Sequence, residues 1–254
     1  MGVLLAPSLV TARDKPYVVA NSLVSAAASS EYQHRNYSAA DSKRIATISS
    51  HLKWTSATSH GVIFGSGDAG GPNDSLMLRR RGDNQRLELL IYMGGALVTQ
   101  VLSSASYTDT TDWHHYACVI DTSQAASADR FKLYYDGSQI TSFAVDTRQG
   151  QNTDTALGDT KFFIGRLDYA ATGYLDAKVS DWAYQDGVSE SISNLTDGGS
   201  PVDKSSLDFG AEGVLLQFGD NSTVAALGTD TSGNGNDMTV VNFSTTDQST
   251  DVPA

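Results

Sequence analysis

The sequence contains a single cysteine, Cys118, and only 5 prolines among its 254 residues. One cysteine cannot close an intrachain disulfide, and the chain offers no cysteine pair for a zinc site. Apolar runs are also short, and none approaches the roughly 20 residues that a membrane-spanning helix needs. These absences exclude a disulfide-stapled mini-domain and a zinc-dependent fold, and we expect no membrane insertion.

Basic residues and glutamate are scarce as well. Lys and Arg number 17 against 29 for Asp and Glu, which gives a net charge of −12. A nucleic-acid-binding surface needs clustered Lys and Arg to neutralise phosphates, so we expect no nucleic acid partner. Only 4 residues are Glu, whereas 31 Ser, 23 Thr and 23 Gly favour turns and strands over helices. The composition predicts an all-β protein.

Short apolar segments, separated by turn residues, follow one another along most of the chain. Alternation is clear over 45–54 and 113–120, and Asp136-Gly137 is typical of a hairpin turn. No window keeps a helical apolar period over three turns. About ten such segments predict an antiparallel two-sheet sandwich over residues 31–254, preceded by an extended N-terminal arm of residues 1–30.

Four segments in a fixed order carry a more specific signal. They are 36–54, which ends in H-L-K-W, then D-W-H-H-Y-A-C-V-I-D at 112–121 with R-F-K-L-Y-Y-D-G-S-Q-I at 130–140, then F-F-I-G-R at 162–166 with Y-L-D-A-K-V-S-D at 174–181, and D-T-S-G-N-G-N-D at 230–237. Together, over roughly residues 32–243, they resemble the laminin-G-like, concanavalin A-like lectin and glucanase domain. The resemblance implies a jelly-roll sandwich and a lectin-like function.

The run D-N-S-T-V-A-A-L-G-T-D at 220–230, which continues to Phe243-Ser244, resembles structural proteins of marine tailed phages. This resemblance implies a non-enzymatic virion protein, in a tail fibre or as a capsid decoration, that attaches to glycans or to a host surface. Residues 1–30 would then bind other virion proteins, and several copies would form a homo-oligomer. The alternative that stays open is a free carbohydrate-binding lectin of a bacterium.

The segment at 230–237 is also a candidate calcium site. Asp230, Asn234, Asn236 and Asp237 offer the oxygen ligands that calcium prefers, within one glycine-hinged loop. The bidentate Glu that closes an EF-hand loop is missing. The same residues are typical of a turn whose Asx side chains bind their own backbone. Calcium binding and a purely structural turn are therefore the two hypotheses for this loop.

Sugar binding would use exposed aromatic rings that stack on sugar faces. The candidates are Tyr169, Tyr174, Trp182 and Tyr184, near the loop ends of the later strands. Trp182 and Tyr184 alternate with core positions along their strand, so packing in the core is the competing interpretation.

Catalytic patterns are weak. A retaining glycosidase needs two carboxylates about 5–5.5 Å apart, which on this fold usually come from E-x-D-x-E along one strand, and no Glu stands in such a run. We therefore disfavour a glycosidase and expect no catalytic residues. Trp113 and Cys118 are expected in the core, while His114 and His115 are expected on opposite faces of one strand.

One cluster of basic residues interrupts the acidic background. It consists of Arg79, Arg80, Arg81 and Arg86, around a predicted hairpin turn. Two interpretations are open: a solvated hairpin, or a patch that docks on an acidic partner such as a neighbouring copy.

Overall fold

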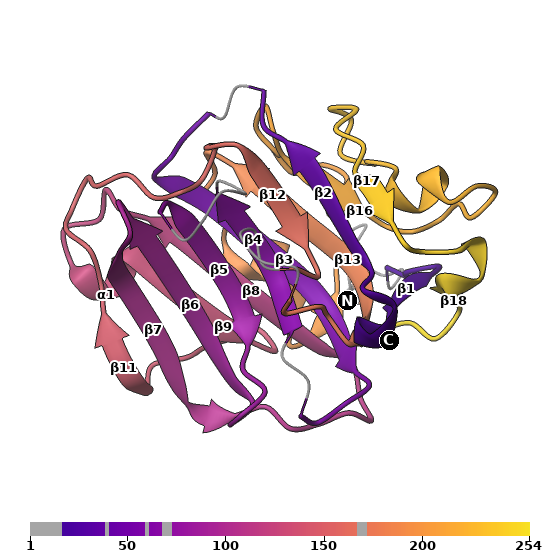
Figure 1. The fold of residues 1–254 in the computed structure, drawn as a ribbon, viewed down its shortest axis with the longest axis horizontal. Helices are drawn as coiled ribbons and strands as arrows, with labels where there is room; N and C mark the ends of the chain where they lie inside the picture. Colours follow the sequence, from indigo (N-terminus) through magenta and orange to yellow (C-terminus); the bar gives the residue numbers. More distant parts are fainter. Residues whose placement is uncertain (1–16, 39–40, 59–60, 68–72, 167–171) are drawn as a thin grey trace, which may run out of the picture.

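The computed structural model describes residues 17–38, 41–58, 61–67, 73–166 and 172–254. Its fold consists of two large antiparallel sheets (Figure 1). Sheet A contains β1 (Ser22–Ser25), β3 (Ile45–Trp54), β8 (His114–Asp121), β9 (Phe131–Tyr135), β10 (Ser138–Gln139), β13 (Ala177–Asp186), β16 (Val214–Leu216) and β18 (Gln248–Ser249). Sheet B contains β2 (Tyr32–Asn36), β4 (Gly61–Gly67), β5 (Ser75–Arg80), β6 (Arg86–Met93), β7 (Ala96–Ser106), β11 (Phe143–Thr147), β12 (Lys161–Ile164) and β17 (Thr239–Val241).

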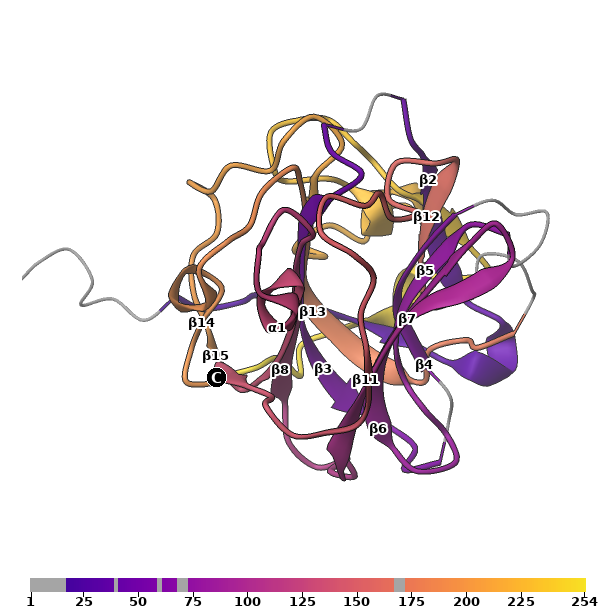
Figure 2. The same ribbon diagram turned by 90° about the vertical axis from the view of Figure 1, so that its left-hand side faces the viewer.

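Strands far apart in the sequence are neighbours in both sheets. The order in sheet A is β10-β9-β8-β3-β13-β1-β18, with β16 beside β13, and the order in sheet B is β11-β7-β6-β5-β4-β12-β2-β17. Figure 2 shows β8, β3 and β13 in one layer and β7, β5 and β4 in the other. The predicted all-β jelly-roll sandwich is confirmed.

The core lies between the two sheets. Alternation along β3 turns Ile48, Leu52 and Trp54 inward, where each is fully buried. Across the core, the rings of Phe162 and Trp182 stack with centroids 6.4 Å apart and planes within 8°. Apolar burial of this extent is the main stabilising contribution to a sandwich fold.

Helices are few and short in the described part of the chain. The one α-helix, α1 (Ser127–Arg130), has 4 residues, and the four 3₁₀ turns have 3 or 4 residues each. Within the described ranges, no helix has the length and apolar character that crossing a membrane requires.

The described part of the predicted N-terminal arm belongs to the sandwich. β1 pairs with β13 on one side and with β18 on the other. Leu23 is buried in the core, and the Ser22 hydroxyl donates to the carbonyl of Asp251 at 2.7 Å. Residues 22–25 of the predicted arm are therefore a strand of sheet A, and residues 1–16 lie outside the described residues.

Residues 187–213, here called the covering segment, run over the outer face of sheet A, which is turned away from sheet B. They carry a small hairpin of β14 (Thr196–Asp197) and β15 (Ser200–Pro201), which Figure 2 shows beyond sheet A. Phe209 packs there in one cluster with Ala183 and Leu215. Because this segment shields the outer face, β3 and β13 are buried on both sides.

Candidate functional site

A polar groove of about 300 Å³ opens at one end of sheet A. It is here called the Trp113 groove, and its lining residues are Asp112, Trp113, His114, Asp136, Gly198, Gly199, Ser200, Pro253 and Ala254. Four structural units meet there: the start of β8, the turn between β9 and β10, the turn between β14 and β15, and the C-terminal segment after β18. Its volume lies at the lower end of the range of small-molecule sites, roughly 300–1,000 Å³.

Trp113 lies in the groove and not, as the sequence predicted, in the core. It is half-buried because it precedes β8, where the covering segment no longer shields the outer face. Its indole nitrogen donates a hydrogen bond to Oδ1 of Asp251 at 2.9 Å. Oδ2 of Asp251 accepts hydrogen bonds from Lys178 at 2.5 Å and Lys53 at 3.1 Å. These contacts hold the ring in one orientation, and the Lys178 and Trp113 hydrogen bonds lower the pKa of Asp251.

His114 is held between two carboxylates at the floor of the groove. Its Nδ1 lies 2.8 Å from Oδ2 of Asp136, and its Nε2 lies 3.2 Å from Oδ2 of Asp109. Burial works against the charged imidazole, but the hydrogen bonds to Asp136 and Asp109 outweigh it and raise the pKa of His114. The neighbouring His115 is fully buried under the covering segment, so the predicted divergence of the two histidines is confirmed.

The β14–β15 turn forms the opposite wall and lies against Asp136. Asp136 and Gly137 both adopt left-handed backbone conformations, with φ of 46° and 72°, as a tight hairpin requires. Gly199 has a φ of 107°, and a Cβ added to it would lie 3.1 Å from Oδ1 of Asp136. Only glycine fits this contact without displacing the wall.

The groove combines the features of a site for a polar ring-shaped ligand. The partly buried Trp113 contributes part of its indole ring to the mainly polar lining, and the exposed Asp112 and Ser200 side chains provide hydrogen-bonding groups beside it. An aromatic ring with a few convergent polar groups is typical of ligand sites.

The aromatic residues predicted for sugar binding do not form one site. Trp182 and Tyr184 are fully buried in the core and cannot stack on a ligand, so the prediction is wrong for both. Both side chains point toward sheet B, because residues two positions apart on β13 lie on the same face of the strand. Tyr169 lies outside the described residues.

Tyr174 remains partly exposed, on the outer face of sheet B. Its ring lies 6.3 Å from that of Tyr32, which in turn lies 6.4 Å from the ring of Phe163. The guanidinium of Arg166 lies over Tyr32 at 4.8 Å and over Phe163 at 5.6 Å. Because Arg166 already occupies these ring faces, the cluster offers less stacking surface than the groove.

The acidic loop at 230–237 is compact and hydrogen-bonded to the protein. Oδ1 of Asp230 accepts backbone N–H groups of Leu215 and Ser232 at 3.0 and 2.9 Å, and Oδ2 accepts the Ser232 hydroxyl and the Asn236 N–H at 2.8 and 2.9 Å. Asp237 accepts the N–H of Asp230 at 2.9 Å. The lone pairs of these carboxylate oxygens are thus already used by N–H and O–H donors. Fewer of them are available to a cation than in an open calcium site.

The two asparagines of this loop connect it to the covering segment. Asn234 donates to the carbonyls of Gly210 and Gly213 at 2.7 and 3.1 Å, and Asn236 donates to those of Ala211 and Gly213 at 2.9 and 3.0 Å. Among the described residues, no three His, Cys, Asp or Glu side chains are grouped to hold a metal ion. The arrangement fits a structural turn better than a calcium loop, and calcium binding here stays a prediction.

Three arginines of the basic cluster make contacts within the fold. Arg79 and Arg81 both form ion pairs with the buried Glu88, at 2.6 and 3.3 Å. Arg80 is fully buried, with its guanidinium 3.8 Å from the ring centre of Trp54. The interpretation as a docking patch is therefore wrong for Arg80, which no partner can reach, and it stays a prediction for Arg79, Arg81 and Arg86.

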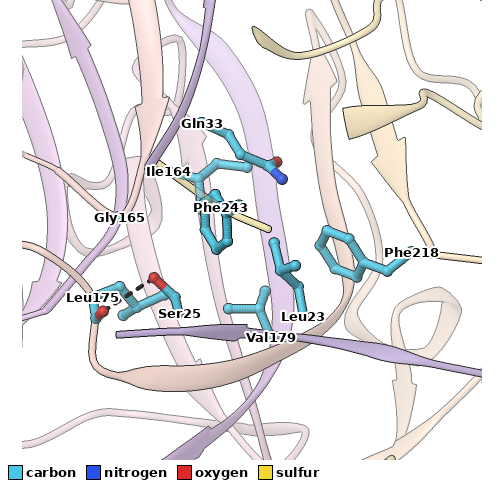
Figure 3. A pocket seen from close by; sticks show the side chains of 9 residues that line it. All are labelled: Leu23, Ser25, Gln33, Ile164, Gly165, Leu175, Val179, Phe218 and Phe243. Carbon is cyan, nitrogen blue, oxygen red and sulfur yellow. Dashed lines mark hydrogen bonds between the residues drawn. The ribbon is translucent and has the colours of Figure 1, made fainter. Parts of the chain in front are cut away.

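An apolar cavity also lies between the sheets, beside β1 (Figure 3). Figure 3 shows Leu23, Val179, Phe218 and Phe243 pointing into it. Its volume is about 10 Å³, about the smallest space that holds one water molecule. It is a packing defect of the core and too small for a sugar.

The family of the chain follows from comparison with known proteins. The family model described as the concanavalin A-like lectin/glucanases superfamily matches residues 27–191, more than half of the chain. The chain belongs to this family, in its laminin G group. A search of curated proteins finds no match.

Several solved structures are similar to this chain at low sequence identity. A "putative carbohydrate binding protein" from Bacteroides ovatus has a TM-score of 0.60 and 15% identity, with 94% of this chain and 62% of that one covered. This chain thus spans less than two thirds of that protein. The LG4-5 domains of mouse laminin α1 have a TM-score of 0.47 and 15% identity, covering 81% and 48%. The CBM40 module of the Ruminococcus gnavus IT-sialidase has a TM-score of 0.45 and 14% identity, covering 69% and 97%.

Proposed function

We propose that this chain is a non-catalytic glycan-binding module and that the Trp113 groove is its ligand site. The observation that carries the proposal is the half-exposed Trp113, fixed by Asp251, in a 300 Å³ groove beside exposed polar side chains. The lectin-like family and the fold shared with the Bacteroides ovatus protein support it.

The groove would hold a sugar through two kinds of contact. The apolar face of a pyranose ring packs on the Trp113 indole, which keeps its orientation because Asp251 binds its nitrogen. The hydroxyl groups of the sugar donate to the Asp112 carboxylate and exchange hydrogen bonds with Ser200. Pre-fixed groups of this kind reduce the entropy lost on binding.

A glycan array followed by titration with the best ligand tests this function. Trp113→Ala should reduce affinity at least 10-fold, in line with the loss of one stacked aromatic contact of more than about 1.4 kcal/mol. Tyr174→Ala is the matched control, since it removes a partly exposed aromatic ring on the other sheet. Loss of binding in Tyr174→Ala alone would move the site to sheet B, and no binding to any glycan would refute the function.

The place where such a module is displayed is a separate question. The phage resemblance predicts a virion protein with further virion partners and several copies, while a free bacterial lectin would use the groove in the same way. Immunogold labelling of purified particles distinguishes the two, because label on capsids or tails requires a virion protein.

A further inference from the structure

A fully buried polar cluster lies directly beneath the β14–β15 wall of the groove. It consists of His51 on β3, His115 on β8, Asp181 on β13 and Lys204 on the covering segment, none of which is exposed to solvent. Burying an ionisable group costs free energy unless the group is paired, so the pairing within this cluster decides how stable it is.

Two contacts from this cluster hold the wall in place. Lys204 forms an ion pair with Oδ2 of Asp181. Nε2 of His51 donates to the carbonyl of Gly199, a residue of the groove wall, at 3.0 Å. The wall is therefore attached to sheet A through His51 and Asp181.

The same cluster leaves polar atoms without partners. Nδ1 of His51, Nδ1 of His115 and Oδ1 of Asp181 are buried and have no hydrogen bond. Because Nε2 of His51 carries the proton that Gly199 accepts, its Nδ1 is an unprotonated acceptor that lies 4.0 Å from Oδ2 of Asp181. A proton on Nδ1 would find an acceptor within a movement of about one ångström.

Asp181 is also held in an unusual backbone conformation. Its φ is +49°, and it lies where the pairing of β13 with β3 shifts register between Ser180 and Ala183. A non-glycine residue persists in this conformation only when its surroundings enforce it. The bulge points the carboxylate outward, to where Lys204 and His51 both reach it.

We propose that Asp181 exchanges Lys204 for His51 on acidification, and that this exchange detaches the β14–β15 hairpin and opens the Trp113 groove. At neutral pH the carboxylate binds Lys204 and the wall is closed. When Nδ1 of His51 gains a proton, the imidazolium moves toward Asp181 as its new acceptor and away from the carbonyl of Gly199. Lys204 and the hairpin then both lose their partners on sheet A. The consequence for ligand release rests on the proposed function, while the opening of the hairpin does not.

The electrostatics of the cluster favour this direction. Burial, together with the charge of Lys204, lowers the pKa of His51 to about 3. Burial, His51 and Lys204 lower the pKa of His115 as well. The groups that face His51 are His115 from β8, Asp181 from β13 and Lys204 from the covering segment, and Tyr17 and Asp203 interact with Asp181 from further out.

Proton linkage determines whether acidification favours the open or the closed state. In the open state His51 meets solvent and titrates near its ordinary pKa of about 6.5, so the open state binds more protons than the closed state between pH 6.5 and 3. Acidification from pH 7.5 to 5.0 should thus raise the opening equilibrium about 30-fold. Burial raises the pKa of Asp181, which acts in the opposite direction, so a His51 variant is needed to isolate the effect.

Hydrogen exchange of the full chain at pH 7.5 and 5.0, corrected for intrinsic rates, tests the proposal. Peptides covering 191–205 should show about 30-fold more opening at pH 5.0, while β3 and β8 stay protected. His51→Gln, which can still donate to Gly199 but cannot be protonated, should remove the part of this difference that His51 contributes and leave only what His115 adds. His34→Gln on sheet B is the matched control and should preserve it.

Two results would overturn the switch: opening that does not change with pH, or the same pH dependence in His51→Gln. If His51→Gln does not fold, the wild-type chain still decides, since opening must follow the titration of the His51 ring measured by NMR. If the hairpin opens at low pH as predicted but the chain binds no glycan, the switch is retained and the proposed function is refuted. If the chain binds glycans with an affinity independent of pH and the hairpin does not open, the proposed function is retained and the switch is refuted.

Discussion

Nε1 of Trp113 donates a hydrogen bond to Oδ1 of Asp251 at 2.9 Å, across 138 positions of sequence. Asp251 lies in the C-terminal segment after β18, and the two lysines that bind its other oxygen come from β3 and β13. A single carboxylate therefore connects the half-buried aromatic ring of the groove to two central strands of sheet A.

Removal of this carboxylate should affect both stability and binding. Asp251→Ala loses a hydrogen bond to Trp113 and two partly exposed ion pairs, and we expect unfolding to become easier by about 1–2 kcal/mol. Asp251→Asn is the control, because its amide oxygen still accepts from Trp113. Chemical denaturation and glycan titration should show that Asp251→Asn keeps most of the affinity that Asp251→Ala loses. Equal losses in both variants would mean that charge, not the orientation of Trp113, is what matters.

His114 should stabilise the chain most at low pH. Its pKa is raised in the folded state, so the extra stability is fully present below the unfolded pKa of about 6.5 and is lost as pH rises through the raised value. We expect a difference of about 1 kcal/mol between wild type and His114→Gln at pH 6, and a smaller one at pH 8.5. Urea denaturation at several pH values measures it, and a difference that grows with pH would contradict the Asp109–His114–Asp136 arrangement.

Gly198 and Gly199 allow a matched test of the groove wall. A Cβ on Gly199 would meet Asp136 at 3.1 Å, whereas a Cβ on Gly198 would meet nothing within 4 Å, although both residues have positive φ. Gly199→Ala should therefore weaken glycan binding at least 10-fold, while Gly198→Ala should have an effect of only a few-fold from backbone strain. Similar affinities for the two variants would show that the wall does not shape the ligand site.

The response to calcium distinguishes the two hypotheses for the loop at 230–237, a calcium site and a structural turn. Because its side chains bind backbone groups of the covering segment, we expect the melting temperature to be the same with calcium and with EDTA. Asn236→Ala should lower stability by about 1–3 kcal/mol under both conditions, since it leaves the buried carbonyl of Gly213 with one donor fewer. A calcium-dependent rise in melting temperature that is absent in Asp230→Asn would instead support the calcium site.

The strands and the turns of this protein could be predicted from local sequence patterns. Alternation along 45–54 placed Ile48, Leu52 and Trp54 on one side, and Asp136-Gly137 marked the turn that now borders the groove. These features depend on neighbouring residues alone, so they can be read without knowing the fold. The motifs from 51–54 to 230–237 then led to the right family.

Which faces of the strands are covered depends on packing between distant segments. A period of two separates the sides of a strand but does not say what packs on each, so Trp182 and Tyr184 looked available for sugars although sheet B covers them. Trp113 continues the alternation of β8, yet it lies at the edge of the face that the covering segment shields and stays partly exposed. The cluster under that segment joins side chains from 51 to 204, and no local pattern predicts contacts over such a distance.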